Sequence, residues 1–299
     1  MLALSRLRLL YEFASHGSIR ATAIATGQTA SAVSQQLRAL EKEIGVPLLE
    51  RTARSARLTD TGQRLVEHAG EILDAIAAAE ADVASMDDSP QGQVTVSATP
   101  SVAVALAGSV MRRVRKHPDL TLVFRQQPTA SEAVSRVKTG EVDLALVDDW
   151  SGMRHPETEG PLTYHYLFHD PLMAILPKGH RLAEEERISM RRLAGESWIA
   201  SPEGEPSRVA LERLWRRESI KAPLSVFEGL DTILTLVSKG LGVTVAPWMA
   251  TLGRRGISTR PLIGVAPARE IYVVHRTVSK ARPSVMTVLR ALHEGARNF

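Results

Sequence analysis

Residues 18–58 read SIRATAIATGQTASAVSQQLRALEKEIGVPLLERTARSARL, a stretch that predicts two helices joined by a tight turn. Ser18 is a favourable N-cap for the first helix, because its hydroxyl can accept a hydrogen bond from a free backbone amide. Gly27 permits the turn, since glycine adopts positive φ angles at little cost. Thr29 can cap the second helix, and Gly45 stands where a helix commonly ends. The stretch therefore predicts a helix–turn–helix unit.

The second helix, over about residues 29–44, is predicted to have one apolar and one polar side. The apolar stripe consists of Val33, Leu37, Leu40 and Ile44. The opposite side carries the polar and basic residues Thr29, Ser31, Ser34, Gln35 and Arg38. Such groups hydrogen-bond base edges and phosphates when a helix lies in the major groove of DNA. An ordinary solvated helix face uses the same residue types, but the preceding helix and glycine turn favour the DNA interpretation.

A short segment with three arginines follows this helix. Arg51, Arg54 and Arg57 recur within residues 48–58, which are too few and too basic for a core element and predict a small hairpin. These arginines either contact DNA phosphates or are simply exposed on a loop. Residues 1–58 contain 8 Lys and Arg against 4 Asp and Glu, a balance of +4. That excess favours a polyanionic partner for this end of the chain.

A long helix is predicted from Thr59, its N-cap, to about residue 86. Residues 59–90 carry one Arg against 8 Asp and Glu, a balance of −7. Apolar residues recur at spacings close to a coiled-coil seam: Leu65, Ile72, Leu73, Ile76, Ala79 and Val83. The stripe can pack on its own domain or pair two copies of the chain, and the length of the helix favours a homodimer. The polar segment from Asp87 to Gly92 contains Pro90, so a domain boundary is expected there.

Predicted strands and helices alternate from residue 92 to the C-terminus. Strand candidates lie at 94–97, 120–125, 142–147, 172–176, 198–199, 226–227, 243–245 and 271–274. Helical patterns include 209–217, 231–239 and 285–293. Such alternation predicts an α/β domain with parallel sheets and ligands beyond the carboxyl ends of the strands. The segment is long enough for two lobes, with crossovers expected at 150–161 and 261–267.

Composition excludes several kinds of site. The 299 residues contain no cysteine, which rules out disulfides, thiolate metal ligands and cysteine nucleophiles. Apolar stretches are too short to span a membrane and the N-terminus has no signal-peptide pattern, so a cytoplasmic location is expected. Asp148 and Asp149 are adjacent and would face opposite ways on a strand, which makes a poor carboxylate pair. His165 and His169 would share a strand face without an evident third ligand. We therefore expect no enzyme activity, no cofactor and no metal site.

Three blocks of residues resemble the DNA-binding head of LysR-type transcriptional regulators. They are Ala32-Val33-Ser34-Gln35-Gln36-Leu37, Gly45-Val46-Pro47-Leu48-Leu49-Glu50-Arg51 and Leu58-Thr59-Asp60-Thr61-Gly62. The resemblance implies a winged helix–turn–helix, a linker helix that forms a dimer, usually within a tetramer, and a two-lobed effector domain like the periplasmic solute-binding proteins. It also implies binding to a partly palindromic site near a promoter. Ala30 departs from the polar residue that the family often has there, so base contacts are expected from the polar residues of the same helix named above.

The expected fold is thus α+β and multi-domain. The expected boundaries are 1–58 for the winged helix–turn–helix domain, 59–91 for the linker helix and hinge, and 92–299 for the effector domain. Within that domain, one lobe is expected at 92–161 with 267–299, and the other at 162–266. We therefore expect a sequence-specific DNA-binding regulator that a small-molecule effector modulates from between the lobes. The alternative is a two-lobed small-molecule-binding protein or transferase whose N-terminal helices serve only partner contacts.

Candidate effector-binding residues follow the predicted strands. They are Ser97, Thr99, Ser101, Thr129 and Ser201, and the resemblance implies that these loops line the cleft between the lobes. Free amides at a helix N-terminus attract anions, although a single Ser or Thr there commonly serves only as a cap. Residues 91–299 carry 28 Lys and Arg against 21 Asp and Glu, a balance of +7. This balance suggests a carboxylate effector, and surface solvation explains it equally well.

Overall fold

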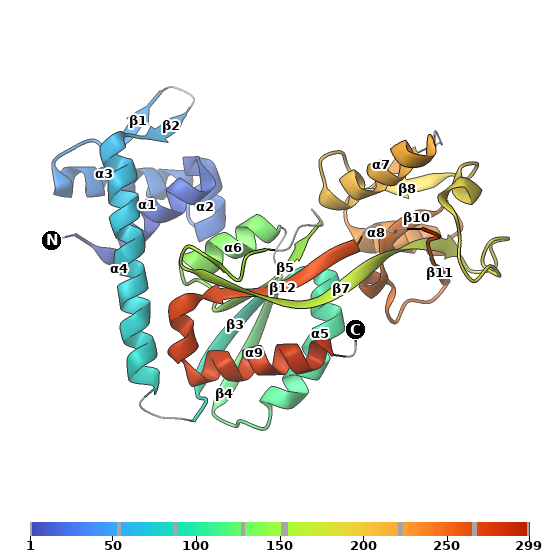
Figure 1. The fold of residues 1–299 in the computed structure, drawn as a ribbon. Coiled ribbons are helices and arrows are strands. Elements are labelled where there is room, and N and C mark those ends of the chain that lie inside the picture. Colours follow the sequence, from blue (N-terminus) through green and yellow to red (C-terminus); the bar gives the residue numbers. More distant parts are fainter. Residues whose placement is uncertain are drawn as a thin grey trace.

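The computed structural model describes residues 2–52, 55–85, 89–126, 129–150, 155–220, 224–264, 268–297 and 299. Figure 1 shows a small helical head at the N-terminus, the long helix α4 (Asp60–Ser85) beside it, and a two-lobed domain that contains the C-terminus. The predicted fold class is confirmed: an N-terminal helix–turn–helix domain precedes a two-lobed domain of mixed α/β content. Within the described part of the chain, no helix has the length and apolar composition needed to cross a membrane.

The head contains three helices and a two-stranded hairpin: α1 (Leu4–His16), α2 (Ile19–Thr26), α3 (Ala30–Ile44), β1 (Leu49–Arg51) and β2 (Ala56–Leu58). The predicted caps form, because the hydroxyls of Ser18 and Thr29 each accept a hydrogen bond of 3.2 Å from the amide three residues on. Gly27 ends α2 in the left-handed conformation with φ of 65°, which glycine tolerates. The predicted stripe of α3 is buried in the core of the head, with Val33 and Leu40 both 0% exposed.

Helix α4 begins as predicted and then packs on two different partners. Its N-cap is Thr59, whose hydroxyl accepts a hydrogen bond of 2.9 Å from the Gly62 amide. The helix packs first against α1 of the head and then against η3 (Thr277–Ala281) of the two-lobed domain. Leu73 of the predicted seam is buried, whereas Ile72 and Val83 are exposed. The seam is therefore divided between contacts inside the chain and an uncovered apolar edge.

The first lobe is a sheet covered by helices on both faces. It contains β3 (Gly92–Ala98), α5 (Pro100–Val114), β4 (Leu120–Gln126), α6 (Ala130–Lys138), β5 (Leu144–Asp149), β6 (Thr158–Glu159) and α9 (Pro283–Ala296). Strand β3 is parallel to β4 and to β5. Helices α5 and α9 cover one face, with Leu106 and Val288 fully buried, and Val137 of α6 is buried on the other face.

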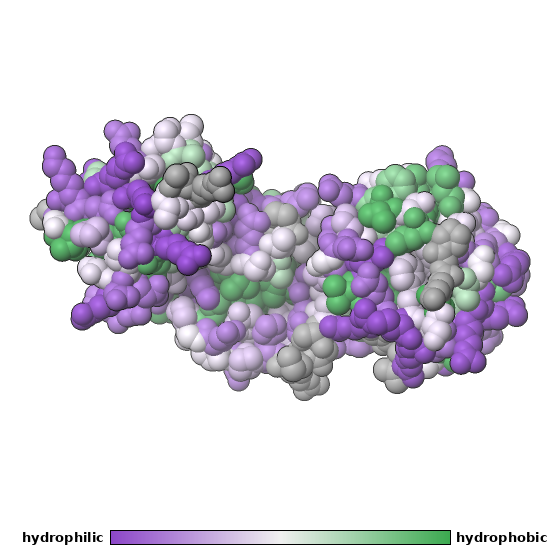
Figure 2. All heavy atoms as spheres, turned by 90° about the horizontal axis from the view of Figure 1, so that it is seen from above, coloured by the Kyte–Doolittle hydropathy of each residue, from purple (hydrophilic) through white to green (hydrophobic). Residues whose placement is uncertain are grey.

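The second lobe has a smaller core around Trp198, which is fully buried and packs edge-to-face on Trp215 at 5.2 Å between ring centroids. Its elements are η1 (Met190–Leu193), β8 (Trp198–Ala200), α7 (Pro206–Glu218), β9 (Leu224–Val226), α8 (Leu230–Ser238), β10 (Thr244–Pro247), η2 (Trp248–Thr251) and β11 (Ile257–Pro261). Figure 2 shows hydrophobic residues gathered on the surface of this lobe, whereas the head is mainly hydrophilic in the same view. Exposed apolar side chains of the lobe include Val226 and Phe227.

Two long strands, β7 (Leu162–Pro177) and β12 (Ala268–Arg276), run between the lobes (Figure 1). The main sheet has the order β10-β7-β12-β5-β3-β4, and β7 is antiparallel to β10, β11 and β12. The expectation of parallel sheets is therefore wrong for this part of the domain. The predicted strand at 172–176 is only the end of β7. The chain crosses between the lobes within these two strands. Their antiparallel pairing satisfies the backbone hydrogen-bonding groups in the crossing.

Candidate nucleic-acid interface and ligand cleft

The polar side of α3 is uncovered. Thr29, Ser31, Gln35 and Arg38 are exposed and Ser34 is half-buried, opposite the buried apolar stripe. Thr29 uses its hydroxyl both to cap α3 and to contact the Ser31 hydroxyl at 3.0 Å. A different side of the head faces the first lobe, where residues of α1 and α2 share a pocket with Arg136 and Glu141. The described part of the chain therefore leaves the polar side of α3 free for a partner.

The β1–β2 hairpin is attached to α3 through one carboxylate. Glu41 accepts hydrogen bonds of 3.0 Å from the amides of Leu48 and Leu49, and Arg51 Nη1 donates to its other oxygen at 2.7 Å. Burial alone would raise the pKa of Glu41, but the hydrogen bonds from Arg51 and the two amides lower the pKa below its ordinary value. The carboxylate thus stays charged and fixes the hairpin beside the polar side of α3.

The three arginines of this segment do not have equivalent surroundings. Arg51 is only 26% exposed and is paired with Glu41, so its main contact holds the hairpin in place. Arg57 lies on β2 and is exposed. Arg54 lies outside the described residues. The sequence pattern treated the three arginines alike because the partner of Arg51 lies ten residues earlier on another element.

A cluster of buried charges, which no sequence pattern indicated, lies where the two lobes meet. Arg269 of β12 pairs with Asp170 of β7 at 2.9 Å and with Asp148 of β5 at 3.1 Å. Arg269 Nη2 also donates to the Ser101 hydroxyl at the start of α5, at 2.8 Å. The Arg269 and Asp170 side chains are 3% and 0% exposed. Because burial of a charge is costly without partners, the cluster depends on all of its contacts.

Aromatic and backbone groups complete this cluster. The Trp150 ring lies 5.8 Å from the Arg269 guanidinium, and Trp150 Nε1 donates to Asp148 at 3.0 Å. Asp170 also accepts from the Met249 amide at 3.0 Å. Burial raises the pKa of Asp170, against the opposing effect of Arg269 and of these hydrogen bonds. Asp148 and Asp149 do diverge as predicted, since Asp149 lies 3.8 Å from His155 instead.

The predicted effector residues have three kinds of environment. Ser97 is fully buried, and its Oγ and the Oγ1 of Thr99 have no hydrogen-bond partner in the described part of the chain. Ser101 is held by Arg269. Thr129 caps α6, accepting from the Glu132 amide at 3.2 Å. Ser201 is buried and its hydroxyl lies 2.5 Å from that of Ser207. Thr129 and Ser201 thus have local structural contacts, whereas Ser97 and Thr99 have unused polar atoms.

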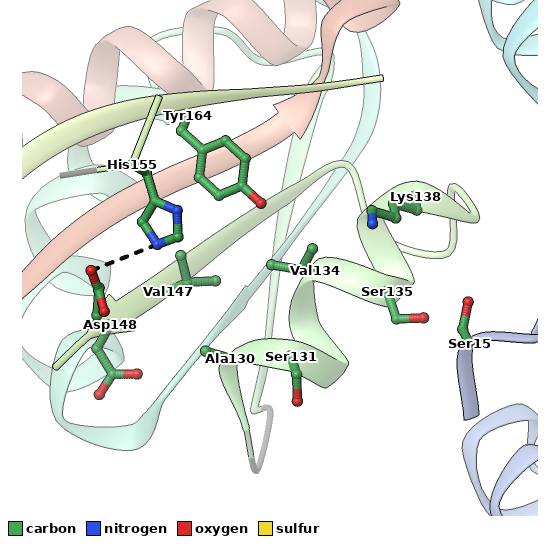
Figure 3. A pocket seen from close by; sticks show the side chains of 11 residues that line it. Ser15, Ala130, Ser131, Val134, Ser135, Lys138, Val147, Asp148, His155 and Tyr164 are labelled. Carbon is green, nitrogen blue, oxygen red and sulfur yellow. Dashed lines mark ion pairs between the residues drawn. The ribbon is translucent and has the colours of Figure 1, made fainter. Parts of the chain in front are cut away.

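A pocket of about 480 Å³ lies on the other face of the first lobe, between α6, β5 and Ser15 of the head. Figure 3 shows Ser131, Ser135 and Lys138 of α6 on one side, with Tyr164 and His155 on the other. The His155 ring stacks on Tyr164 at 4.9 Å between centroids. The five predicted effector residues are not among the side chains described as lining it. No sequence pattern indicated this pocket, because its residues come from separate elements.

The prediction that His165 and His169 share a strand face is wrong. His169 is paired with Glu270 at 2.9 Å, whereas His165 contacts His275. The pairing of β7 with β12 shifts register between these positions, and an extra residue in one strand reverses the alternation of its side chains. Among the described residues, no group of three or more His, Asp or Glu side chains is arranged to hold a metal ion.

Two family models match the chain. The LysR substrate binding domain matches residues 87–297, and the bacterial regulatory helix-turn-helix protein of the lysR family matches residues 4–63. A probable hydrogen peroxide-inducible genes activator of Streptomyces viridosporus is 29% identical over 99% of this chain and 95% of its own. The uncharacterized HTH-type transcriptional regulator YnfL of Escherichia coli K12 is 31% identical over 72% of each chain.

A solved structure shows the same fold. Full-length OxyR from Pseudomonas aeruginosa superposes with a TM-score of 0.65 over 98% of each chain, at 20% identity. The two family models together extend over the head and the two-lobed domain, which disfavours a transferase with N-terminal helices used only for partner contacts. The chain belongs to the LysR family of DNA-binding transcriptional regulators.

Proposed function

We propose that the chain binds promoter DNA with α3 in the major groove and the β1–β2 hairpin beside the neighbouring phosphates. The observation that carries this proposal is the exposed polar side of α3, with Gln35 and Arg38 opposite the apolar stripe that packs into the core of the head. Gln pairs well with adenine and Arg with guanine, and the hydroxyls of Ser31 and Ser34 suit bases or phosphates. Arg57 supplies a phosphate contact, Arg54 is proposed for the same role, and Arg51 contributes mainly by positioning the hairpin.

We propose that a small-molecule effector binds between the lobes at the start of α5. Thr99, the N-cap, makes no side-chain cap bond, and its hydroxyl and that of Ser97 are buried without a partner. These hydroxyls and the free amides of the helix N-terminus are hydrogen-bond donors, which suits a carboxylate. Ser101 is positioned there by Arg269. Thr129 and Ser201 belong to the same proposal as the cleft walls of the first and second lobes.

We propose a homodimer through α4, within a homotetramer. The apolar edge that α4 leaves outside its own chain includes Ile72, 39% exposed, and Val83, 69% exposed. Ile76 and Ala79 lie between them at coiled-coil spacing. Further exposed apolar residues, Val104 on α5 and Phe227 after β9, offer surfaces for contacts between effector domains. The domain division proposed from the sequence, 1–58, 59–91 and 92–299, fits this assembly.

We propose that the effector domain responds to the binding of a small molecule and not to the oxidation of a thiol. The S. viridosporus relative is named for induction by hydrogen peroxide, but the present chain contains no cysteine to oxidise. The relatives are transcriptional regulators, and we propose that this chain likewise has no enzyme activity and needs no cofactor. Its DNA partner implies a cytoplasmic location.

Footprinting of the full chain on the DNA that flanks its own gene tests the proposal. We expect protected half-sites with dyad symmetry, one or more helical turns apart. Affinity should fall by roughly 10³–10⁵ between 50 and 200 mM salt if six to ten phosphates are contacted. Equal affinity for the flanking DNA and for random DNA would contradict the proposal. A thermal-shift screen of carboxylates, repeated with Thr99→Val, tests the effector site, and an unchanged shift in that variant would exclude it.

A further inference from the structure

Three histidines from three elements meet inside the first lobe. His165 of β7 and His275 of β12 have their Nε2 atoms 3.1 Å apart, and their rings stack at 5.2 Å between centroids. His293 of α9 packs edge-on to His165 at 5.7 Å. His275 is fully buried, and the other two are half-buried. We call these residues the histidine cluster.

The facing nitrogens of His165 and His275 can share one proton, but they cannot both carry one. His275 Nδ1 lies 2.7 Å from the Arg276 carbonyl oxygen, which can only accept, so this nitrogen carries a proton. A neutral His275 then offers its Nε2 as an acceptor, and His165 Nε2 donates to it. A proton on both facing Nε2 atoms, as in a doubly charged pair, would place two N–H groups against each other at 3.1 Å. The geometry therefore opposes protonation of both rings.

The charged neighbours of the cluster are mostly positive. Lys280 of η3 acts on both His165 and His275, and Arg297 acts on His293. Glu157, just before β6, is the acidic group that favours protonation of His165. Burial, followed by the neighbouring histidines and Lys280, lowers the pKa of His165 to about 4. Burial also lowers the pKa of His275 and, with Arg297, that of His293.

The cluster lies beneath the part of the effector domain that holds the linker helix. Strand β12 ends one residue after His275, at Arg276, and continues directly into η3, which packs against α4. Arg276 also acts electrostatically on Asp74 of α4. Thr277, the first residue of η3, is fixed by its amide to the Pro161 carbonyl at 2.8 Å and by its hydroxyl to Thr163 at 2.9 Å. The position of η3 thus depends on the same pair of strands that carries the cluster.

We propose that the histidine cluster is an acid-sensitive support for the linker helix, so that proton uptake at mildly acidic pH loosens η3 and releases α4 from the first lobe. The direction of this pH effect follows from the linkage between proton binding and the release of α4. A histidine whose pKa is lowered in the packed state binds a proton more readily once it is released. At pH 7.5, even a released histidine with a pKa of about 6.5 is mostly neutral, and the support is intact. As the pH falls from about 6.5 toward 4, the released state gains protons that the packed state excludes.

Hydrogen exchange of the full chain, read by mass spectrometry at pH 7.5 and pH 5.5, tests this proposal without DNA or effector. Exchange times are scaled for the intrinsic effect of pH on amides. We expect peptides that contain η3 and the segment of α4 around Leu73 to lose protection by roughly tenfold at pH 5.5. This pH lies about one unit below the ordinary histidine pKa of about 6.5, and one extra proton bound over one pH unit changes an equilibrium about tenfold. Peptides of the second lobe should keep their protection.

Glutamine at the two half-buried positions removes the titration while keeping polar groups. The double variant His165→Gln, His293→Gln should retain the protection of η3 at both pH values. The matched control is His169→Gln, on the same strand but paired with Glu270 outside the cluster, which should lose protection as the natural chain does. If circular dichroism shows the double variant unfolded at pH 7.5, His293→Gln alone should show a smaller loss than the natural chain. Unchanged protection in the natural chain, an equal loss in the variants, or a loss extending to the second lobe would overturn the proposal.

Discussion

The head and the effector domain place their polar side chains in opposite ways. In the head, the functional candidates on α3 are exposed, and the hydroxyl caps bond amides only three residues away. In the effector domain, Arg269 is buried and its partners lie far along the chain, from Asp170 at a separation of 99 residues to Ser101 at 168. Apart from the cap Thr29, the proposed DNA contacts of α3 therefore come from side chains that contribute little to folding, whereas the buried polar groups around Arg269 also stabilise the effector domain.

This difference has a measurable consequence. A substitution on the exposed side of α3 should change DNA affinity and leave the free energy of unfolding nearly unchanged. A substitution in the Arg269 cluster should change both stability and any ligand response. The four predictions that follow, each with a comparison variant, test this separation, beginning with the largest effect.

Arg269→Met should destabilise the effector domain by about 3–5 kcal/mol, because removing one partner leaves the buried Asp170 carboxylate uncompensated. Urea unfolding of the full chain measures the change. Arg181→Met is the control, since Arg181 is 62% exposed and its pair with Glu196 should contribute under about 1 kcal/mol. A loss no larger than that of the control would show that the cluster is not structural. The polar side chains of the effector domain would then contribute as little to stability as those exposed on α3.

Gly62→Ala should destabilise the junction of head and linker by about 1–3 kcal/mol. A Cβ at this position would lie 2.2 Å from the Leu48 carbonyl oxygen, so the hairpin or α4 must shift. Thermal unfolding and DNA retardation should both be affected, since the hairpin adjoins α3. Gly108→Ala in α5 is the matched control, because its Cβ would meet only the Arg112 side chain at 3.6 Å. Equal behaviour of the two variants would contradict the close packing at Gly62.

Arg38→Ala should weaken binding to the specific DNA site by about 1–3 kcal/mol, roughly 5- to 150-fold, and reduce the preference over random DNA. The unfolding midpoint should not move, because Arg38 is exposed. Lys116→Ala removes the same charge from an exposed loop of the effector domain and should leave affinity nearly unchanged. If Arg38→Ala lowered stability as much as affinity, the separation of folding from function in the head would be lost.

The head and the effector domain also differ in how much of their structure could be predicted from the sequence. The caps Ser18, Thr29 and Thr59, the turn at Gly27 and the stripe of α3 all depend on residues within one or two helical turns, and the structure confirms them. The blocks that resemble LysR-type regulators lie in this region. Local signals were sufficient there, because residues close in the sequence determine where each helix begins, where it ends and which side of it is buried.

The effector domain depended on contacts that no local pattern carries. The sixteen-residue β7 was predicted only in part, since its alternation is interrupted where the register shifts against β12. No periodic pattern indicated the role of Arg269, because its partners Asp148 and Asp170 lie on other strands. The same limit applied in the head to Arg51, whose partner Glu41 lies on α3.

The smallest effect should separate Arg57 from Arg51. Arg57→Ala should weaken DNA binding only several-fold and reduce the slope of log affinity against log salt by about 1, as expected for one lost phosphate contact. Stability should stay constant, because the Arg57 side chain is exposed. Arg51→Ala should instead lower the unfolding midpoint of the head, since Glu41 loses the 2.7 Å hydrogen bond that offsets its burial. Retardation assays at several salt concentrations, with thermal unfolding of both variants, measure the two quantities. An equal change in salt slope and no change in stability for Arg51→Ala would restore it as a phosphate contact equivalent to Arg57.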